Sequence, residues 1–153
     1  MSKAKTPSHS KTIKTEVVCP NDTNPVGILQ GGRLVQWMDI AAAVSAQTHA
    51  GKICVTASID KVSFENPAFV GDIITIEAKL TRAFSRSMEI FVSAWSSNIR
   101  RPKHLLISKS YFTFVALDDN GSPTSVPQVN PVSKEDIELF NSAGDRRGRM
   151  SKQ

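Results

Sequence analysis

The 153-residue chain has no apolar run approaching the ~20 residues that cross a bilayer, and its N-terminus lacks the apolar core of a signal peptide. Its only cysteines, Cys19 and Cys54, lack the paired spacing of a zinc site or a disulfide framework. A P-loop, a GxGxxG motif and the GxSxG elbow of serine hydrolases are also missing. The sequence therefore predicts no membrane span and no metal site, and two reduced thiols favour a cytoplasmic location.

The net charge of +5 comes from the two ends of the chain. Four lysines give residues 1–15 a charge of +4, and residues 145–153 carry a net +3, so residues 16–144 carry −2. Because the basic residues lie outside the body of the chain and no nucleic-acid-binding motif accompanies them, we expect no nucleic-acid partner. The final Ser151-Lys152-Gln153 differs from the peroxisomal S-K-L signal in its last residue.

Residues 34–50 form the most informative stretch, LVQWMDIAAAVSAQTHA, whose helix-forming residues are apolar on nearly every side. A helix of this kind is normally buried. Its one charged residue is Asp39, and a carboxylate is costly to bury unless it is paired, hydrogen-bonded or protonated. Gly31 and Gly32 precede the stretch and leave the N–H groups of the first helical turn accessible to a ligand. Asp39 is therefore a candidate functional residue.

Alternating apolar and β-branched residues predict strands on both sides of this helix. One strand is expected within residues 11–19, and four follow the helix, within residues 53–64, 72–84, 86–97 and 105–117. Consecutive strands favour an antiparallel sheet, so the fold class is α+β. One helix can be apolar all round only if the sheet curls around it. This predicts the hotdog fold, a long central helix wrapped by a five-stranded antiparallel sheet.

Three segments are expected along the chain. Residues 1–10 are short, polar and basic, and they are predicted to be disordered. Residues 11–132 are predicted to form one folded domain. Residues 133–153 are predicted to form a C-terminal helix and a basic tail, with Ser133 as the N-cap and acidic residues in the first turn.

Three stretches carry a family resemblance. Residues 22–51 contain an Asn, then Gly-Gly, then Met-Asp; residues 55–90 contain Val-Thr-Ala-Ser, Phe-x-x-Pro, Val-Gly-Asp and Ser-Met-Glu; residues 112–123 contain Phe-Val-Ala. In this order and spacing they resemble the hotdog-fold acyl-CoA thioesterases, in the acyl-CoA and acetyl-CoA hydrolase branch. The resemblance covers about residues 12–130.

The resemblance implies a thioester hydrolase that converts acyl-CoA to a free carboxylic acid and CoA, with a place in fatty acid metabolism. It implies a homo-oligomer in which two subunits join their sheets into a dimer, with trimers of dimers (hexamers) common in the family. By resemblance Asp39 is the catalytic carboxylate, and Asn24 is its partner across the dimer interface. Gly31 and Gly32 stand where family members offer N–H groups to the thioester carbonyl.

The resemblance also implies where CoA binds, with CoA being part of the substrate and product and no other cofactor or metal required. The implied contacts are Ala57, Ser58, Ile59, Arg86, Ser87, Met88, Arg146 and Arg147. One alternative is a non-catalytic acyl-CoA or lipid-binding protein on the same fold. A hotdog hydratase is a weaker alternative, because such enzymes pair an acid with a nearby histidine and His49 is ten residues from Asp39.

Overall fold

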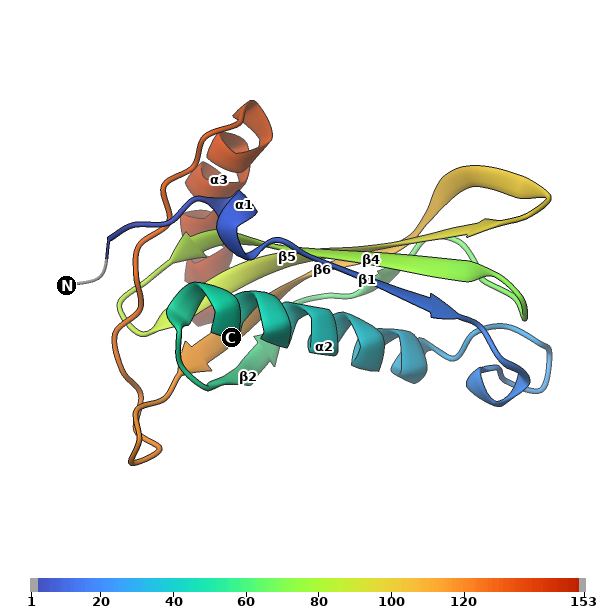
Figure 1. Ribbon diagram of the computed structural model, residues 1–153, viewed down its shortest axis with the longest axis horizontal. Coiled ribbons are helices and arrows are strands. Elements are labelled where there is room, and N and C mark those ends of the chain that lie inside the picture. The colour runs from blue at the N-terminus through green and yellow to red at the C-terminus, as the bar shows by residue number, and fades with distance from the viewer. Residues whose placement is uncertain (1–2, 152–153) are drawn as a thin grey trace.

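The computed structural model describes residues 3–151, with side chains through residue 148. Ser151-Lys152-Gln153 lies at and beyond this limit, so the comparison with a peroxisomal signal stays untested. One antiparallel sheet has the order β1-β4-β5-β6-β2, with β3 also pairing with β6 (Figure 1). Its strands are β1 (Thr12–Val17), β2 (Cys54–Ile59), β3 (Ser63–Phe64), β4 (Ile73–Ala83), β5 (Ser87–Asn98) and β6 (Arg101–Ala116).

The long helix α2 (Gly31–Ala50) lies along one face of this curved sheet (Figure 1). It ends at Gly51, whose φ of 67° is the left-handed conformation that glycine tolerates best. The apolar face of α2 packs on alternate residues of β4, β5 and β6 and forms the core. Buried side chains at this contact include Met38, Ala42, Ile76, Ile90, Phe112 and Phe114. This confirms the hotdog architecture expected from the sequence.

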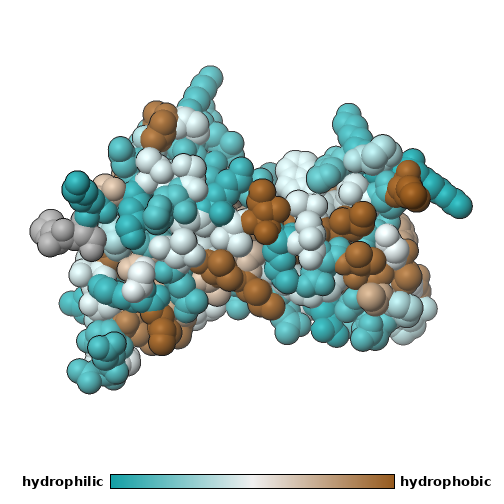
Figure 2. Space-filling model, viewed as in Figure 1, coloured by the Kyte–Doolittle hydropathy of each residue, from teal (hydrophilic) through white to brown (hydrophobic). Residues whose placement is uncertain are grey.

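The prediction that α2 is buried on every side is wrong for the single chain. Ile40 is 44% exposed and Val44 46% exposed, so one side of the helix faces away from its own sheet. Figure 2 shows hydrophobic side chains spread over the face on which α2 and β1 lie. α2 therefore carries more apolar side chains than a single chain buries.

The sheet has six strands where five were expected, because residues 53–64 do not form one continuous strand. β2 stops at Ile59, and the N–H of Asp60 still donates to the carbonyl of Tyr111 in β6 (2.9 Å). Pairing with β6 then resumes over the two residues of β3. The alternating sequence pattern does not reveal this interruption.

The N-terminal residues that the structure describes are ordered, contrary to the prediction of disorder for residues 1–10. A single turn of helix, α1 (Pro7–Ser10), buries Pro7 and Ser10. Before it, Lys5 forms a bridge with Val129, and its ammonium group donates to the carbonyl of His49 (2.8 Å). A short polar segment therefore gains order from residues more than 40 positions away.

The C-terminal helix α3 (Lys134–Ser151) lies on the sheet face opposite α2 (Figure 1). Ser133 caps it as expected, since its hydroxyl accepts the N–H of Asp136 at 3.0 Å. Lys79 of β4 forms an ion pair with Asp136 (2.8 Å) at the start of α3. Residues 146–151, which include Arg146 and Arg147, belong to this helix.

Candidate active site

Asp39 lies in the middle of α2 and is only half-buried within its own chain. The hydroxyl of Thr56, on the neighbouring edge strand β2, donates a hydrogen bond of 2.7 Å to Asp39 Oδ1. The other carboxylate oxygen has no partner in the part of the chain that the structure describes. One oxygen is thus held in place while the second is free to act on a ligand.

The N-terminus of α2 presents open N–H groups. Gln30 occupies the N-cap position without a side-chain cap, because its amide donates to the carbonyl of Thr23 (3.0 Å). Within residues 3–151, the N–H groups of Gly31 and Gly32 have no acceptor, as the geometry of a helix start requires. These groups and the helix dipole favour a partial negative charge at this end.

The loop that precedes α2 carries Asn24. Its carbonyl oxygen accepts the N–H groups of Val26 and Ile28, both at 3.1 Å, which fixes the loop. The amide NH₂ of Asn24 has no partner among the described residues and is half-exposed. Asn24 makes no hydrogen bond to Asp39 in the same chain, and Asp39 lies about 12 Å along the helix from its first residue.

A groove opens beside the N-terminus of α2. It encloses about 410 Å³ and is lined by apolar groups that include Leu34, Phe64 and Ile107. Gly31 lies at its wall, where an added Cβ would stand 3.1 Å from the ring of Phe64. The open N–H groups therefore border an apolar space.

The two strand segments expected at CoA lie on either side of β6. Ser87 of β5 and Val55 of β2 both pair with Val115, so the start of β5 and the start of β2 share one end of the sheet. At the same end Arg86 is exposed in the hairpin between β4 and β5. Ala57 and Ile59 are exposed along the edge strand β2, and Ser58 is half-buried there.

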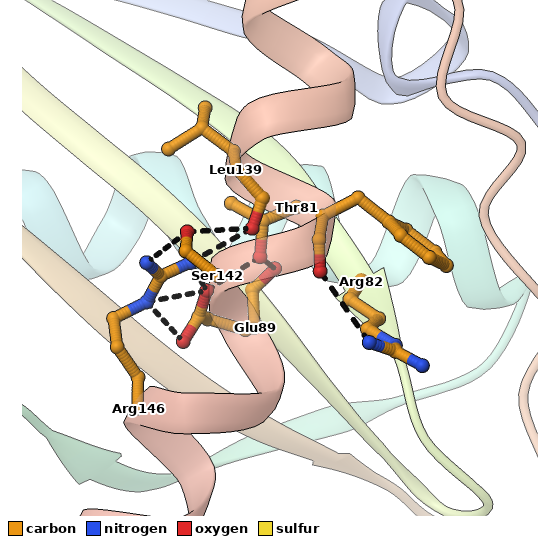
Figure 3. Close-up of polar contacts among 7 residues, drawn as sticks. Thr81, Arg82, Glu89, Leu139, Ser142 and Arg146 are labelled. Atoms are coloured by element: carbon orange, nitrogen blue, oxygen red, sulfur yellow. Dashed lines mark hydrogen bonds and ion pairs between the residues drawn. The ribbon is translucent and has the colours of Figure 1, made fainter.

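Three of the residues expected at CoA have side chains that are buried in the single chain, namely Ser87 (8% exposed), Met88 and Arg146. The side chain of Met88 is fully buried in the core, because strand alternation places it under α2. Arg146 is 7% exposed, and its guanidinium group forms an ion pair with Glu89 of β5 (2.6 Å) (Figure 3). Their assignment to CoA stays a prediction, and the guanidinium group of Arg146 is already bound to Glu89 within its own chain.

Arg147 remains accessible next to this ion pair. Its guanidinium group donates to the hydroxyl of Ser87 (2.8 Å) and lies 4.2 Å from the ring centre of Phe84. Two segments that are 60 residues apart in sequence, both expected at CoA, are therefore in direct contact. The exposed Arg86 adds a positive charge on the hairpin between β4 and β5, which Arg147 of α3 contacts at Ser87.

Sequence reasoning missed two residues of this site. Thr56 was noticed only as part of the Val-Thr-Ala-Ser element, and Glu89 only as part of Ser-Met-Glu. The available signal for Thr56 was its position among apolar neighbours. For Glu89 it was an acid placed between two core residues, Met88 and Ile90. Neither signal identifies the partner, which lies 17 residues away for Thr56 and 57 residues away for Glu89.

Residues 3–148 contain no cluster of three or more side chains suited to hold a metal ion. Among the described helices, none combines the length and apolar character that crossing a membrane requires.

Comparison with known proteins gives matches to thioesterases and acyl-CoA hydrolases, both by sequence and by structure. The sequence pattern of the thioesterase superfamily matches residues 26–103. The chain is 40% identical to the uncharacterized acyl-CoA thioester hydrolase YkhA of Bacillus subtilis, over 90% of this chain and 80% of that protein. It spans only 22% and 25% of two longer mouse thioesterases that it also matches.

Among solved structures, an apo-hexameric acyl-CoA thioesterase superposes with a TM-score of 0.95 at 37% identity, covering 99% of this chain and 97% of that one. An acyl-CoA hydrolase of Staphylococcus aureus, in complex with butyryl-CoA, CoA and CoA disulfide, has a TM-score of 0.92 at 39% identity, covering 97% and 91%. Alanine variants of that enzyme at an aspartate, a threonine and an asparagine have also been solved.

Proposed function

The chain belongs to the thioesterase superfamily, and on that basis we propose that it hydrolyses acyl-CoA thioesters to free acids and CoA at a site shared between two subunits. The observation that carries the proposal is Asp39, with one oxygen held by Thr56 and the other free. The related Staphylococcus aureus hydrolase binds butyryl-CoA and CoA, which supports CoA thioesters as the substrate class.

Hydrolysis needs a polarised carbonyl and an activated nucleophile. Within one chain the N–H groups of Gly31 and Gly32 lie about 12 Å along α2 from Asp39, so those that stabilise the oxyanion on the thioester oxygen come from the second subunit, as Asn24 does. The free oxygen of Asp39 takes a proton from water, which attacks the carbonyl carbon, or it attacks that carbon directly and forms an anhydride that water then hydrolyses; in both routes the C–S bond breaks. The amide of Asn24, whose NH₂ group is unpaired in its own chain, orients the water or the carboxylate from a second subunit. The thiol of CoA leaves with a proton.

Two features of the single chain support assembly. The outer edge of β2 has no neighbouring strand in the part of the chain that the structure describes, and such an edge readily pairs with another chain. The exposed apolar side of α2, with Ile40 and Val44, adds area that a partner covers. We expect a dimer through these elements and a trimer of dimers above it, since a related thioesterase is hexameric.

The nucleotide end of CoA is expected near Arg86, Ser87 and Arg147, with the pantetheine arm along Ala57–Ile59. Both segments lie at one end of the sheet, which supports this placement. A cytoplasmic location stays a prediction.

The experiment that tests the shared site is complementation between Asp39→Asn and Asn24→Ala chains. Each variant alone should lose at least a hundredfold in the release of free thiol from acyl-CoA, the usual scale for a general base. After co-expression, half of the dimers contain one chain of each kind, and one of their two sites is intact. Activity should therefore return to about a quarter of wild type.

No recovery in the mixed sample would contradict a site shared by Asp39 and Asn24 from different chains. Full activity of Asp39→Asn alone would contradict the catalytic role of Asp39. If the wild type binds CoA esters but hydrolyses none from acetyl to palmitoyl, the chain is a binding protein instead.

A further inference from the structure

A buried ion pair joins α3 to the sheet, away from Asp39. Glu89 is 4% exposed and Arg146 7% exposed. The Arg146 Nε donates to both oxygens of Glu89 (3.1 and 3.0 Å), and one terminal nitrogen donates to Glu89 Oε1 (2.6 Å) (Figure 3). Burying two charges costs desolvation energy that apolar side chains would not incur. The pair therefore calls for a role other than stability.

Two further donors of Arg146 are also occupied. They bond the hydroxyl of Ser142 (2.6 Å) and the carbonyl of Leu139 (3.0 Å), both in α3 (Figure 3). The guanidinium group lies 3.8 Å from the ring centre of Tyr111 on β6, and Glu89 accepts a further hydrogen bond from Thr81 of β4 (2.6 Å). Three strands thus hold the last turns of α3 in one position.

Arg147 follows directly in the chain. Consecutive Cα atoms are about 3.8 Å apart, so an immobile Arg146 also fixes the backbone from which Arg147 extends. The Arg147 side chain reaches the hairpin at Ser87 and Phe84, and it stays exposed. A guanidinium group held by one hydroxyl and one ring keeps further donors for a phosphate.

We propose that Glu89 and Arg146 are positioning residues, which hold Arg147 at Ser87 so that it binds a phosphate at the nucleotide end of CoA. This inference rests on the proposed function and adds to it the device that orients the end of α3. Glu89 neutralises Arg146 within the protein, and Arg147 presents the charge to the ligand.

The test compares two substrates, acyl-CoA and the same acyl group on pantetheine, which has no nucleotide phosphates. The readout is the ratio of their kcat/KM values. Arg147→Ala and Glu89→Gln should each lower this ratio roughly 10- to 100-fold, through KM for acyl-CoA, which is the scale of a hydrogen bond to a charged group. The double variant should lose no more than Arg147→Ala alone, because both changes remove the same contact.

A matched control is Asp136→Asn, which removes the shorter of the two ion pairs that Lys79 of β4 forms with α3. It should leave the substrate ratio unchanged. Ser142→Ala, which removes one contact of Arg146, serves if Glu89→Gln does not fold, and it should lower the ratio in the same direction.

Additive losses in the double variant would overturn the inference, and so would an unchanged ratio in Glu89→Gln or Ser142→Ala. If the wild type hydrolyses neither substrate, the proposed function fails. Calorimetric titration with CoA and with pantetheine then tests the positioning role independently of hydrolysis. Weaker binding of CoA but not of pantetheine by the Glu89→Gln or Ser142→Ala variant supports it. Equal effects on both ligands overturn it.

Discussion

Adding one methyl group at Gly32 should stabilise the protein and damage its activity at the same time. Gly32 is the second residue of α2, and a Cβ built there meets no atom within 4 Å. Alanine restricts the unfolded chain and favours the helix by about 0.5–1 kcal/mol. For a protein of this size about 1 kcal/mol shifts Tm by roughly 2–4 °C, so we expect Tm to rise by about 1–4 °C.

The same methyl group would occupy the open space outside the helix N-terminus, where the thioester oxygen is expected. Loss of one oxyanion donor costs about 10²–10³ in kcat in other hydrolases. Partial obstruction of the Gly32 N–H should therefore lower kcat/KM at least about tenfold. Thermal unfolding at constant protein concentration and free-thiol release from acyl-CoA measure the two effects.

Two alanine variants serve as controls. At Gly31 the added Cβ would stand 3.1 Å from the ring of Phe64, which is 60% exposed and can turn aside, so Gly31→Ala should leave Tm nearly unchanged and lower activity. Gly144 of α3 meets only Arg82 at 3.7 Å, so Gly144→Ala should raise Tm without affecting kcat/KM. Wild-type kcat/KM in Gly32→Ala would refute the role of the helix N-terminus.

Three further predictions follow from burial. Ile40→Asp, on the exposed side of α2, should break the assembly into smaller species in sedimentation velocity and abolish thiol release; an unchanged, active oligomer would contradict an interface there. Burial raises the pKa of Cys54 to about 11, whereas Cys19 is exposed, so iodoacetamide at pH 8 should modify one thiol per native chain and two after denaturation. Burial lowers the pKa of His49 below its usual 6.5, so the unfolded chain binds more protons and stability should fall as pH drops below 6.5. Urea unfolding measures the free energy of unfolding at pH 5 and at pH 7.5. The difference between these two values should be smaller for His49→Gln than for the wild type.

Much of the fold was predictable because it depends on neighbours in the sequence. The apolar stretch before Gly51 predicted α2, and alternation predicted the long strands β4, β5 and β6 to within a few residues at most ends. The break between β2 and β3 was not predicted, because the alternating pattern of residues 53–64 runs across it. The order of α1 was missed because its contacts come from distant residues.

The candidate site was predictable in part. Asp39 stood out as one charge in an apolar helix, and the two glycines stood out beside it. Its partner Thr56 did not, because the contact spans two elements that meet only in the folded chain. Arg146 and Arg147 looked equivalent in sequence, but one is buried against Glu89 and the other is exposed at Ser87.

The sequence by itself determined the long helix, the long strands, their antiparallel pairing and the unusual acid in α2, because periodicity and composition act over a few residues. Only the tertiary structure decided which side of α2 stays uncovered, which hydroxyl holds Asp39 and which of the two adjacent arginines stays exposed. These outcomes depend on a helix and strands that are far apart in the chain. Their contacts form only when the sheet curves around α2 and α3 packs on its other face.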